Sequence, residues 1–266
     1  SLIPDALARR VTASTFHSFC SRLLRRYGAR LGLAPGYSIY DTADQTRAVK
    51  RAMEELELST TNFQPSAVLS SISQAKNALQ DADAATANAS DYYTRQVIRI
   101  YHQYTKVLDR NQALDFDDLL LKSVQLMQRD DAVLQALRQR FQYVLVDEYQ
   151  DTNHAQFVMA HGLAGGHRNL CVTGDPDQSI YSWRGAEVGN ILRFEKDFPG
   201  AKVVRLEQNY RSTQPILSAA SSLISNNQGR LGKSLWTESQ EGELIAVPVS
   251  YTHLRAHETE ADLVCR

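Results

Sequence analysis

The sequence predicts an α/β protein in which an open, wound parallel sheet is interrupted by an all-helical insertion. Two short apolar runs with β-branched residues, at residues 143–146 and 169–173, are typical of strands buried on both faces of a parallel sheet. A third run at residues 202–206 is a further candidate strand. Strands that alternate with helical segments favour this class of fold. Residues 40–111 contain no such run, so we interpret them as a helical insertion in the core.

The helices are predicted from apolar residues that recur three and four positions apart. In the first helix Phe16, Phe19 and Leu23 share one face. Asp41 is a suitable N-cap for the second, because its carboxylate can accept a hydrogen bond from an unpaired backbone N–H. The pattern gives helices over about residues 16–27, 41–56, 64–79, 92–108, 119–127, 133–141 and 217–224.

Composition excludes several classes of protein. The formal net charge is −1, so a basic excess that would favour duplex binding is absent, and any nucleic-acid contact must come from a local groove. The three cysteines are widely spaced and suit a reducing compartment rather than a disulfide framework or a zinc site. No apolar run approaches the roughly 18 residues that span a bilayer, and no secretory leader is visible, so we expect a cytoplasmic protein without a membrane partner.

The strongest motif is DEYQDTN, residues 147–153, directly after the first predicted strand. A buried strand that ends in two acids delivers both carboxylates to the carboxyl edge of the sheet, where ligands of open α/β folds bind. Nucleotide hydrolysis needs one carboxylate to hold Mg²⁺ and another to position or deprotonate water, and Asp147 and Glu148 suit these two roles. The alternative is a structural loop in which Asp151 or Thr152 caps the next helix.

A second motif, GDPDQSIYSWRGA at residues 174–186, follows another predicted strand and so reaches the same edge. Gly174 and Pro176 favour a tight turn. The amide of Gln178 can sense a terminal phosphate, and Tyr181 and Trp183 offer flat groups for stacking bases. The alternative is a turn followed by aromatic core packing.

These motifs resemble those of superfamily 1 DNA helicases of the UvrD/Rep/PcrA type. DEYQDTN, GDPDQSIYSWRGA, QNYRS at residues 208–212 and TFHSF at residues 15–19 occur together and in the family's order. DFDDLL at residues 115–120 matches the segment where the family's chain returns from its helical insertion. The resemblance covers residues 11–247 and implies a RecA-like wound sheet followed by the start of a second motor domain.

The resemblance implies a role for each matching residue. It implies that Asp147 coordinates Mg²⁺ and that Glu148 is the general base for ATP hydrolysis. It also implies that Gln178 and Arg211 contact the γ-phosphate and that Tyr210 stacks on the adenine. The guanidinium of Arg211 at the γ-phosphate would stabilise the negative charge that is spread over the phosphoryl oxygens during transfer. The single-stranded DNA contacts are implied for Thr15, Phe16, His17, Tyr181 and Trp183.

The resemblance also sets the expected domain limits. We expect the first motor domain at residues 1–39 and 112–206, the helical insertion at 40–111, and the start of the second motor domain at 207–249. Residues 250–266 depart from the family pattern, and we interpret them as a non-native tail of translated adaptor sequence; the alternative is a strand and an ordinary amphipathic helix.

A phosphate-binding loop is suggested by GRLGKS at residues 229–234, but we reject it. The pattern G-x-x-x-x-G-K-[ST] needs glycine where Asn227 stands, and a strand rather than a helix should precede it. The family's own loop is expected before Val11, where the Gly-Lys-Thr signature is missing. We therefore expect the chain to lack this loop and the C-terminal motifs, and to hydrolyse ATP negligibly by itself.

The favoured function is an ATP-dependent translocase on single-stranded and forked DNA in repair or replication, which the resemblance implies moves 3′→5′. One alternative is the motor part of a helicase–nuclease, which shares these motifs. Another is a non-catalytic single-strand-binding relative, against which the intact Asp147–Glu148 pair counts, because a binding module does not need to activate water. A plain helical structural protein is the remaining alternative.

Overall fold

The computed structural model describes residues 11–88, 91–181, 185–227, 230 and 232–243. Trp183 and the tail at residues 250–266 therefore lie outside the described residues. The chain divides into two compact units, Ser1–Ile191 and Leu192–Arg266, and each is described by itself. The domain limits proposed from the sequence stay predictions.

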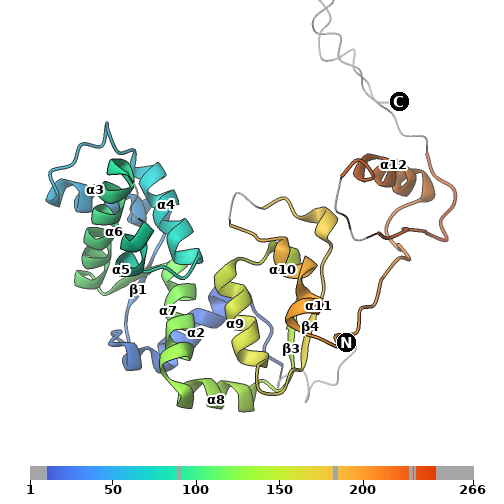
Figure 1. Cartoon of the computed structure of the whole chain (residues 1–266), viewed down its shortest axis with the longest axis horizontal. Coiled ribbons are helices and arrows are strands. Elements are labelled where there is room, and N and C mark those ends of the chain that lie inside the picture. Colours follow the sequence, from blue (N-terminus) through green and yellow to red (C-terminus); the bar gives the residue numbers. More distant parts are fainter. Residues whose placement is uncertain (1–10, 89–90, 182–184, 228–229, 231, 244–266) are drawn as a thin grey trace, which may run out of the picture. The chain divides into compact units, whose positions relative to one another are not determined.

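The structure is a mixture of helices and short parallel strands (Figure 1). The helices before the acidic motif are α2 (Phe16–Tyr27), α3 (Thr42–Glu55), α4 (Pro65–Asn77), α5 (Ala82–Ala85), α6 (Tyr92–Arg110), α7 (Phe116–Arg129) and α8 (Asp131–Arg140). After it come α9 (His154–Ala164), α10 (Gly189–Leu192), α11 (Phe194–Asp197) and α12 (Gln214–Ile224). The strands are β1 (Ser38–Tyr40), β2 (Ala113–Asp115), β3 (Val144–Val146) and β4 (Leu170–Val172). None of the described helices is both long and apolar enough to cross a bilayer.

The predicted helices are confirmed, and capping side chains fix where several of them begin. Asp41 caps α3 as expected, because its carboxylate accepts a hydrogen bond from the backbone N–H of Asp44 at 2.8 Å. The polar stretch after α4 also holds the short helix α5, which periodicity did not predict. Asp81 caps α5 through the backbone N–H of Ala84 at 2.9 Å. A helix of one turn is too short to show an apolar period.

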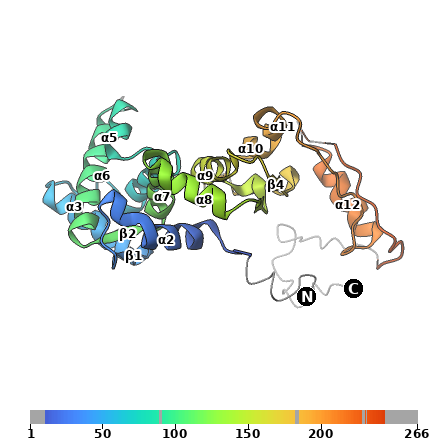
Figure 2. The same ribbon diagram turned by 90° about the horizontal axis from the view of Figure 1, so that it is seen from below.

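The described residues of the first unit form two separate apolar cores. One core, built from α3, α4 and α6 with contributions from α5, includes Val49, Met53, Ile72 and Tyr104. The other lies among α2, α7, α8 and α9. Figures 1 and 2 show α3, α5 and α6 gathered in one group, with α7, α8 and α9 in another. The segment expected to be the helical insertion therefore has a core of its own.

Two short paired strands flank the segment expected to be the helical insertion: β1 precedes α3, and β2 follows α6. β1 and β2 are parallel, with Ser38 opposite Ala113 and Tyr40 opposite Asp115. These strands were not predicted, because Ser38 in β1 and Asp115 in β2 leave no unbroken apolar run in either segment. They join the two ends of the insertion side by side.

A buried ion cluster stands where β2 runs into α7. The Lys76 ammonium, on α4, lies 2.6 Å from Asp115 Oδ2 and 2.9 Å from Asp118 Oδ1, and the Lys76 side chain is 1% exposed. Tyr104 donates a hydrogen bond to Asp115 Oδ2 at 2.9 Å. Burial alone would lower the pKa of Lys76, but the two carboxylates outweigh this desolvation and hold its pKa above its ordinary value. The lysine therefore stays charged and ties α4 to α7.

The second pair of strands carries the acidic motif. β3 and β4 are parallel, with Val144 opposite Leu170 and Val146 opposite Val172, and β3 contacts α9. Both strands were predicted. The expected burial on both faces is wrong for β3, because Leu145 is 76% exposed. Among the described residues β3 pairs with β4 and with no other strand, and the face that carries Leu145 is left uncovered.

The third predicted strand, at residues 202–206, does not form. The described chain there has no regular secondary structure, and Val203, Val204 and Leu206 are exposed. An apolar, β-branched run favours a strand only when a neighbouring strand supplies its hydrogen-bond partners. Of the three predicted strands, only β3 and β4 form among the described residues, and the RecA-like wound sheet stays a prediction.

Replacing Lys76 with alanine should lower the free energy of unfolding by about 3–5 kcal/mol, because two carboxylates would be left buried without their cation. Arg47 provides the matched control, since it pairs with Asp44 on the surface of α3. Arg47→Ala should cost less than about 1 kcal/mol. Urea unfolding of the two variants measures both values, and equal small losses would show that the buried cluster is not stabilising.

Candidate nucleotide-hydrolysis site

The two acids of the DEYQDTN motif follow β3 immediately and are exposed at the carboxyl edge of the sheet. Glu148 adopts a left-handed backbone conformation with φ 50° and ψ 45°. This conformation costs a residue with a side chain on the order of 1 kcal/mol or more, and such residues cluster at functional sites. The backbone therefore turns sharply at Glu148, between the strand and the 3₁₀ turn Tyr149–Asp151.

Asp147 is held in place from the neighbouring strand. Its Oδ1 atom accepts hydrogen bonds from the Thr173 hydroxyl and from the backbone N–H of Glu148, the latter at 3.0 Å. The backbone N–H of Tyr149 donates to the Thr173 carbonyl at 2.9 Å. Sequence reasoning missed Thr173. The sequence carried no signal for it, because only the β3–β4 register, which pairs Val146 with Val172, puts residues 147 and 173 at the same edge.

The donor set at Asp147 fits a magnesium ion that also binds phosphate. Mg²⁺ in nucleotide sites uses one or two carboxylates together with phosphate oxygens and water, rather than a cage of side chains. Asp147 offers an exposed carboxylate whose Oδ2 atom accepts no hydrogen bond from the described residues. Within the described residues there is no group of three or more His, Cys, Asp or Glu side chains that could hold a metal by itself.

Gln150, which sequence reasoning also missed, connects the acidic motif to the second motif. Its side-chain amide donates to Glu148 Oε2 at 2.7 Å and accepts from the backbone N–H of Asp175 at 3.0 Å. Gln150 is 1% exposed. Gly174 leaves the space that Gln150 occupies, because a Cβ atom there would lie 2.3 Å from Gln150 Oε1. Sequence reasoning missed this requirement, which is separate from the turn that Gly174 and Pro176 were expected to favour.

The predicted turn after β4 is present as the 3₁₀ turn Pro176–Gln178. Asp175 caps it by accepting from the backbone N–H of Asp177 at 3.0 Å. The Gln178 amide donates to Asp175 Oδ2 at 2.8 Å. Gln178, the residue proposed to sense phosphate, is thus hydrogen-bonded to Asp175, whose backbone N–H donates to Gln150.

The end of the DEYQDTN motif caps the following helix, but at a different residue from those proposed. Asn153, rather than Asp151 or Thr152, is the N-cap of α9; its side chain accepts from the backbone N–H of Gln156 at 2.9 Å. Asn153 also donates to Asn77 Oδ1 of α4 at 2.5 Å. Burial and the nearby Glu148 carboxylate raise the pKa of Asp151. The DEYQDTN segment therefore caps α9 at its end and exposes the acidic pair at its start.

The residues expected to contact DNA at the start of α2 are ordered by local contacts. The Thr15 hydroxyl caps α2 by accepting from the backbone N–H of Ser18 at 3.3 Å. The rings of His17 and Phe116 pack edge to face, with their centroids 6.0 Å apart. Burial lowers the pKa of His17, and the Asp117 carboxylate offsets this only in part. The imidazole is therefore neutral near pH 7 and offers one donor and one acceptor.

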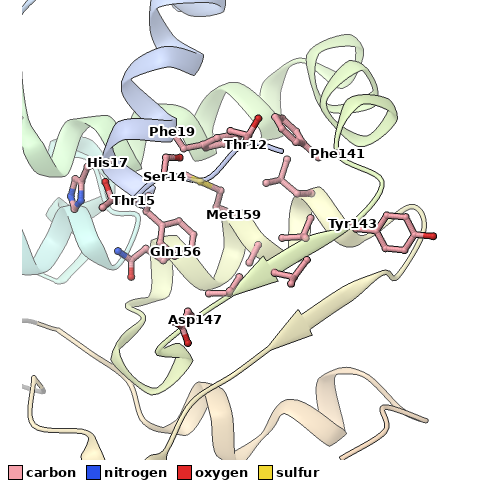
Figure 3. Close-up of a pocket in the computed structure, with 16 residues that line it drawn as sticks. Thr12, Ser14, Thr15, His17, Phe19, Phe141, Tyr143, Asp147, Gln156 and Met159 are labelled. Atoms are coloured by element: carbon pink, nitrogen blue, oxygen red, sulfur yellow. The ribbon is translucent and has the colours of Figure 1, made fainter. Parts of the chain in front are cut away.

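A cavity of about 420 Å³ lies between β3, α9 and the start of α2. Thr15, Phe16 and His17 line it together with Asp147 (Figure 3). In that view Asp147 lies at the carboxyl end of β3, and Phe141 lies at the other end of the cavity. The residues expected to bind DNA and the residue expected to hold Mg²⁺ therefore share one cavity.

The structure also describes Tyr181, Tyr210 and Arg211 among the predicted site residues. Tyr181 is partly exposed, whereas Trp183 falls outside the described residues. In the second unit, Tyr210 is 86% exposed and donates to Gln208 Oε1 at 2.8 Å. Arg211 is exposed on a turn in which its backbone N–H donates to Asn209 Oδ1 at 2.9 Å. The meeting of Tyr210 and Arg211 with the acidic pair stays a prediction.

The rejected phosphate-loop motif follows a helix, as anticipated. α12 precedes it, and no strand leads into it among the described residues. The backbone N–H of Ser234 donates to Glu207 Oε1 at 3.0 Å, so this N–H is paired within the second unit.

Comparison with known proteins matches both units. Residues 1–199 match the UvrD/REP helicase N-terminal domain, and residues 204–266 match the UvrD-like helicase C-terminal domain. The chain is similar to the ATP-dependent DNA helicase PcrA of Bacillus subtilis (strain 168), with 49% identity over 238 residues, 90% of this chain and 32% of that protein. The PcrA of Staphylococcus aureus (strain Mu50 / ATCC 700699) is 44% identical over 253 residues, 95% of this chain and 34% of that protein. The PcrA of Leuconostoc citreum is 44% identical over 265 residues, 99% of this chain and 35% of that protein. The chain spans about a third of the length of these relatives.

Proposed function

The chain belongs to the UvrD/REP helicase family of superfamily 1, and from that premise we propose that the whole protein containing it is an ATP-dependent DNA helicase. It moves along single-stranded DNA in the 3′→5′ direction and opens forked DNA during repair or replication. Each cycle of ATP binding and hydrolysis closes and opens a cleft between two motor domains.

In this proposal the acidic motif performs the chemistry. Asp147 would hold Mg²⁺, and the bound ion would supply positive charge against the charge that develops in phosphoryl transfer. Glu148 accepts a proton from the attacking water. Gln178 contacts the γ-phosphate, and Arg211 stabilises its charge in the transition state, while Tyr210 stacks on the adenine. The exposed Asp147 and Glu148 at the carboxyl edge of the sheet support these roles.

Single-stranded DNA would be bound by Thr15, Phe16, His17, Tyr181 and Trp183. Aromatic faces stack on any base, which suits a motor that moves along DNA without reading sequence. The cavity lined by both Phe16 and Asp147 supports a short route between the DNA path and the hydrolysis site.

The observation that carries the proposal is the joining of the two motifs at one sheet edge. Parallel pairing of β3 with β4 and the Gln150–Asp175 hydrogen bond place the proposed base beside the turn that carries Gln178. A purely structural loop would not need an exposed carboxylate on a strained backbone at this edge.

Glu148→Gln in the whole helicase should reduce steady-state ATP turnover by at least about 10²–10⁴-fold, because the amide cannot accept the water's proton. ATP affinity should be kept. Glu54→Gln makes the same change at an exposed position on α3 and should leave turnover unchanged. Phosphate release and equilibrium nucleotide binding measure the two effects, and unchanged turnover in Glu148→Gln would remove this residue from catalysis.

Trp183→Ala in the whole helicase should weaken binding to single-stranded DNA by about 1–3 kcal/mol, the loss expected for one base stack. Tyr92→Ala removes an exposed aromatic ring from the helical insertion and should have little effect. Fluorescence anisotropy with a labelled oligonucleotide compares the two variants. Equal affinities for Trp183→Ala and the unmodified protein would contradict the stacking role.

The 266-residue chain by itself should release phosphate from ATP no faster than a Glu148→Gln version of the same chain. The reason is that the sequence contains no G-x-x-x-x-G-K-[ST] pattern, whose backbone N–H groups and lysine cradle the phosphates. A coupled phosphate assay with and without single-stranded DNA tests this, and DNA-stimulated release by the unmodified chain would refute it.

A further inference from the structure

The Gln150 side chain has a position and a chemistry that none of the proposed roles uses. It is buried, although it lies between the exposed Glu148 and the turn that begins at Asp175. Buried polar side chains in folded proteins are almost always hydrogen-bonded. Here the nitrogen and the oxygen of the Gln150 amide each make a hydrogen bond.

The two hydrogen bonds demand an amide. One end must donate, because Glu148 Oε2 at 2.7 Å belongs to a carboxylate that accepts hydrogen bonds when ionised. The other end must accept, because its partner is the backbone N–H of Asp175 at 3.0 Å. A glutamate of the same length could accept from Asp175 but, when ionised, could not donate to Glu148.

The surroundings hold this amide in a single orientation. A methyl group at Gly174 would lie 2.3 Å from Gln150 Oε1 and 3.1 Å from the backbone nitrogen of Tyr149, so glycine leaves room for the bond. The Ser179 hydroxyl also donates to the Gln150 carbonyl at 3.5 Å. Side chain and backbone of Gln150 are thus both joined to the second motif.

The path continues to the proposed phosphate sensor. Asp175 Oδ2 accepts a hydrogen bond from the Gln178 amide at 2.8 Å, and the Asp175 backbone N–H donates to Gln150. Three consecutive hydrogen bonds therefore run from Glu148 through Gln150 and Asp175 to Gln178. A shift of the turn on phosphate contact would move the Gln150 amide, whose N–H donates to Glu148 and so orients the base.

We propose that Gln150 is a positioning residue that aims the Glu148 carboxylate and links that aim to the turn carrying Gln178. This rests on the proposed function, because it assigns Gln150 a role only if Glu148 activates water. A base that loses its orientation slows the chemical step without changing how tightly ATP binds.

The test uses Gln150→Glu and Gln150→Leu in the whole helicase. Glutamate keeps the acceptor for Asp175 and removes the donor to Glu148, whereas leucine has a similar size and removes both. Both variants should lose about tenfold to a hundredfold in kcat, the range expected when a charge-assisted hydrogen bond is lost. The KM for ATP and the affinity for single-stranded DNA should stay within about threefold.

Gln125→Glu is the matched control, because Gln125 on α7 also donates to a carboxylate, that of Asp81, at 3.3 Å. It should keep normal kcat. In a Glu148→Gln background, Gln150→Leu should cause no further loss of single-turnover rate, since Gln150 would act through Glu148. Melting temperatures of all variants report whether each one is folded.

Normal kcat in Gln150→Glu would overturn the proposal, since it would show that the donor to Glu148 is dispensable. A raised KM with unchanged kcat would overturn it in favour of a binding role. A further loss in the Glu148→Gln background would also overturn it, by showing that Gln150 acts independently of Glu148. If Glu148→Gln itself keeps full turnover, the proposed function fails instead, so the two failures are distinguishable.

Discussion

The Lys76 ammonium is buried between two carboxylates, and the arrangement of the first unit depends on this ion cluster. A buried ammonium must have paired charges nearby, and Asp115 and Asp118 supply them. The same two residues form the capping box that begins α7, since Asp115 accepts from the backbone N–H of Asp118 at 2.8 Å. The cluster therefore fixes at one point the end of β2, the start of α7 and the helix α4 of the insertion.

Asn77, the residue after Lys76, links the ion cluster to the acidic motif through hydrogen bonds. Asn77 donates to Asp117 Oδ1 at 3.1 Å and accepts from Asn153 at 2.5 Å. Asn153 caps α9 and ends the DEYQDTN segment. At the other end of this segment Thr173 holds Asp147, and Gln150 holds its middle. The loop is thus tied at three places, and an exposed acidic pair can keep a fixed geometry without being buried.

The sequence predicted the features that depend on neighbours along the chain. The Asp41 cap, the helices and the strand Val144–Val146 are set by local spacing. It failed where the outcome depends on what lies across the fold. The strand at residues 202–206 lacks a partner, and Leu145 lacks a covering layer among the described residues. Thr173 and Gln150 were missed because their partners belong to other segments, and only the strand register brings them together.

Strain and support at Glu148 are parts of the same arrangement. A left-handed backbone at a glutamate is unfavourable by itself and persists only when surrounding contacts determine it. Here the support comes from Gln150 and from the Thr173 carbonyl, which accepts the backbone N–H of Tyr149. The Tyr149–Thr173 bond and the Gln150–Asp175 bond both reach across to the segment that follows β4, and Gln150 additionally depends on the absence of a side chain at Gly174. The glycine of the second motif and the glutamine of the first therefore depend on each other, because a side chain at residue 174 would displace the Gln150 amide.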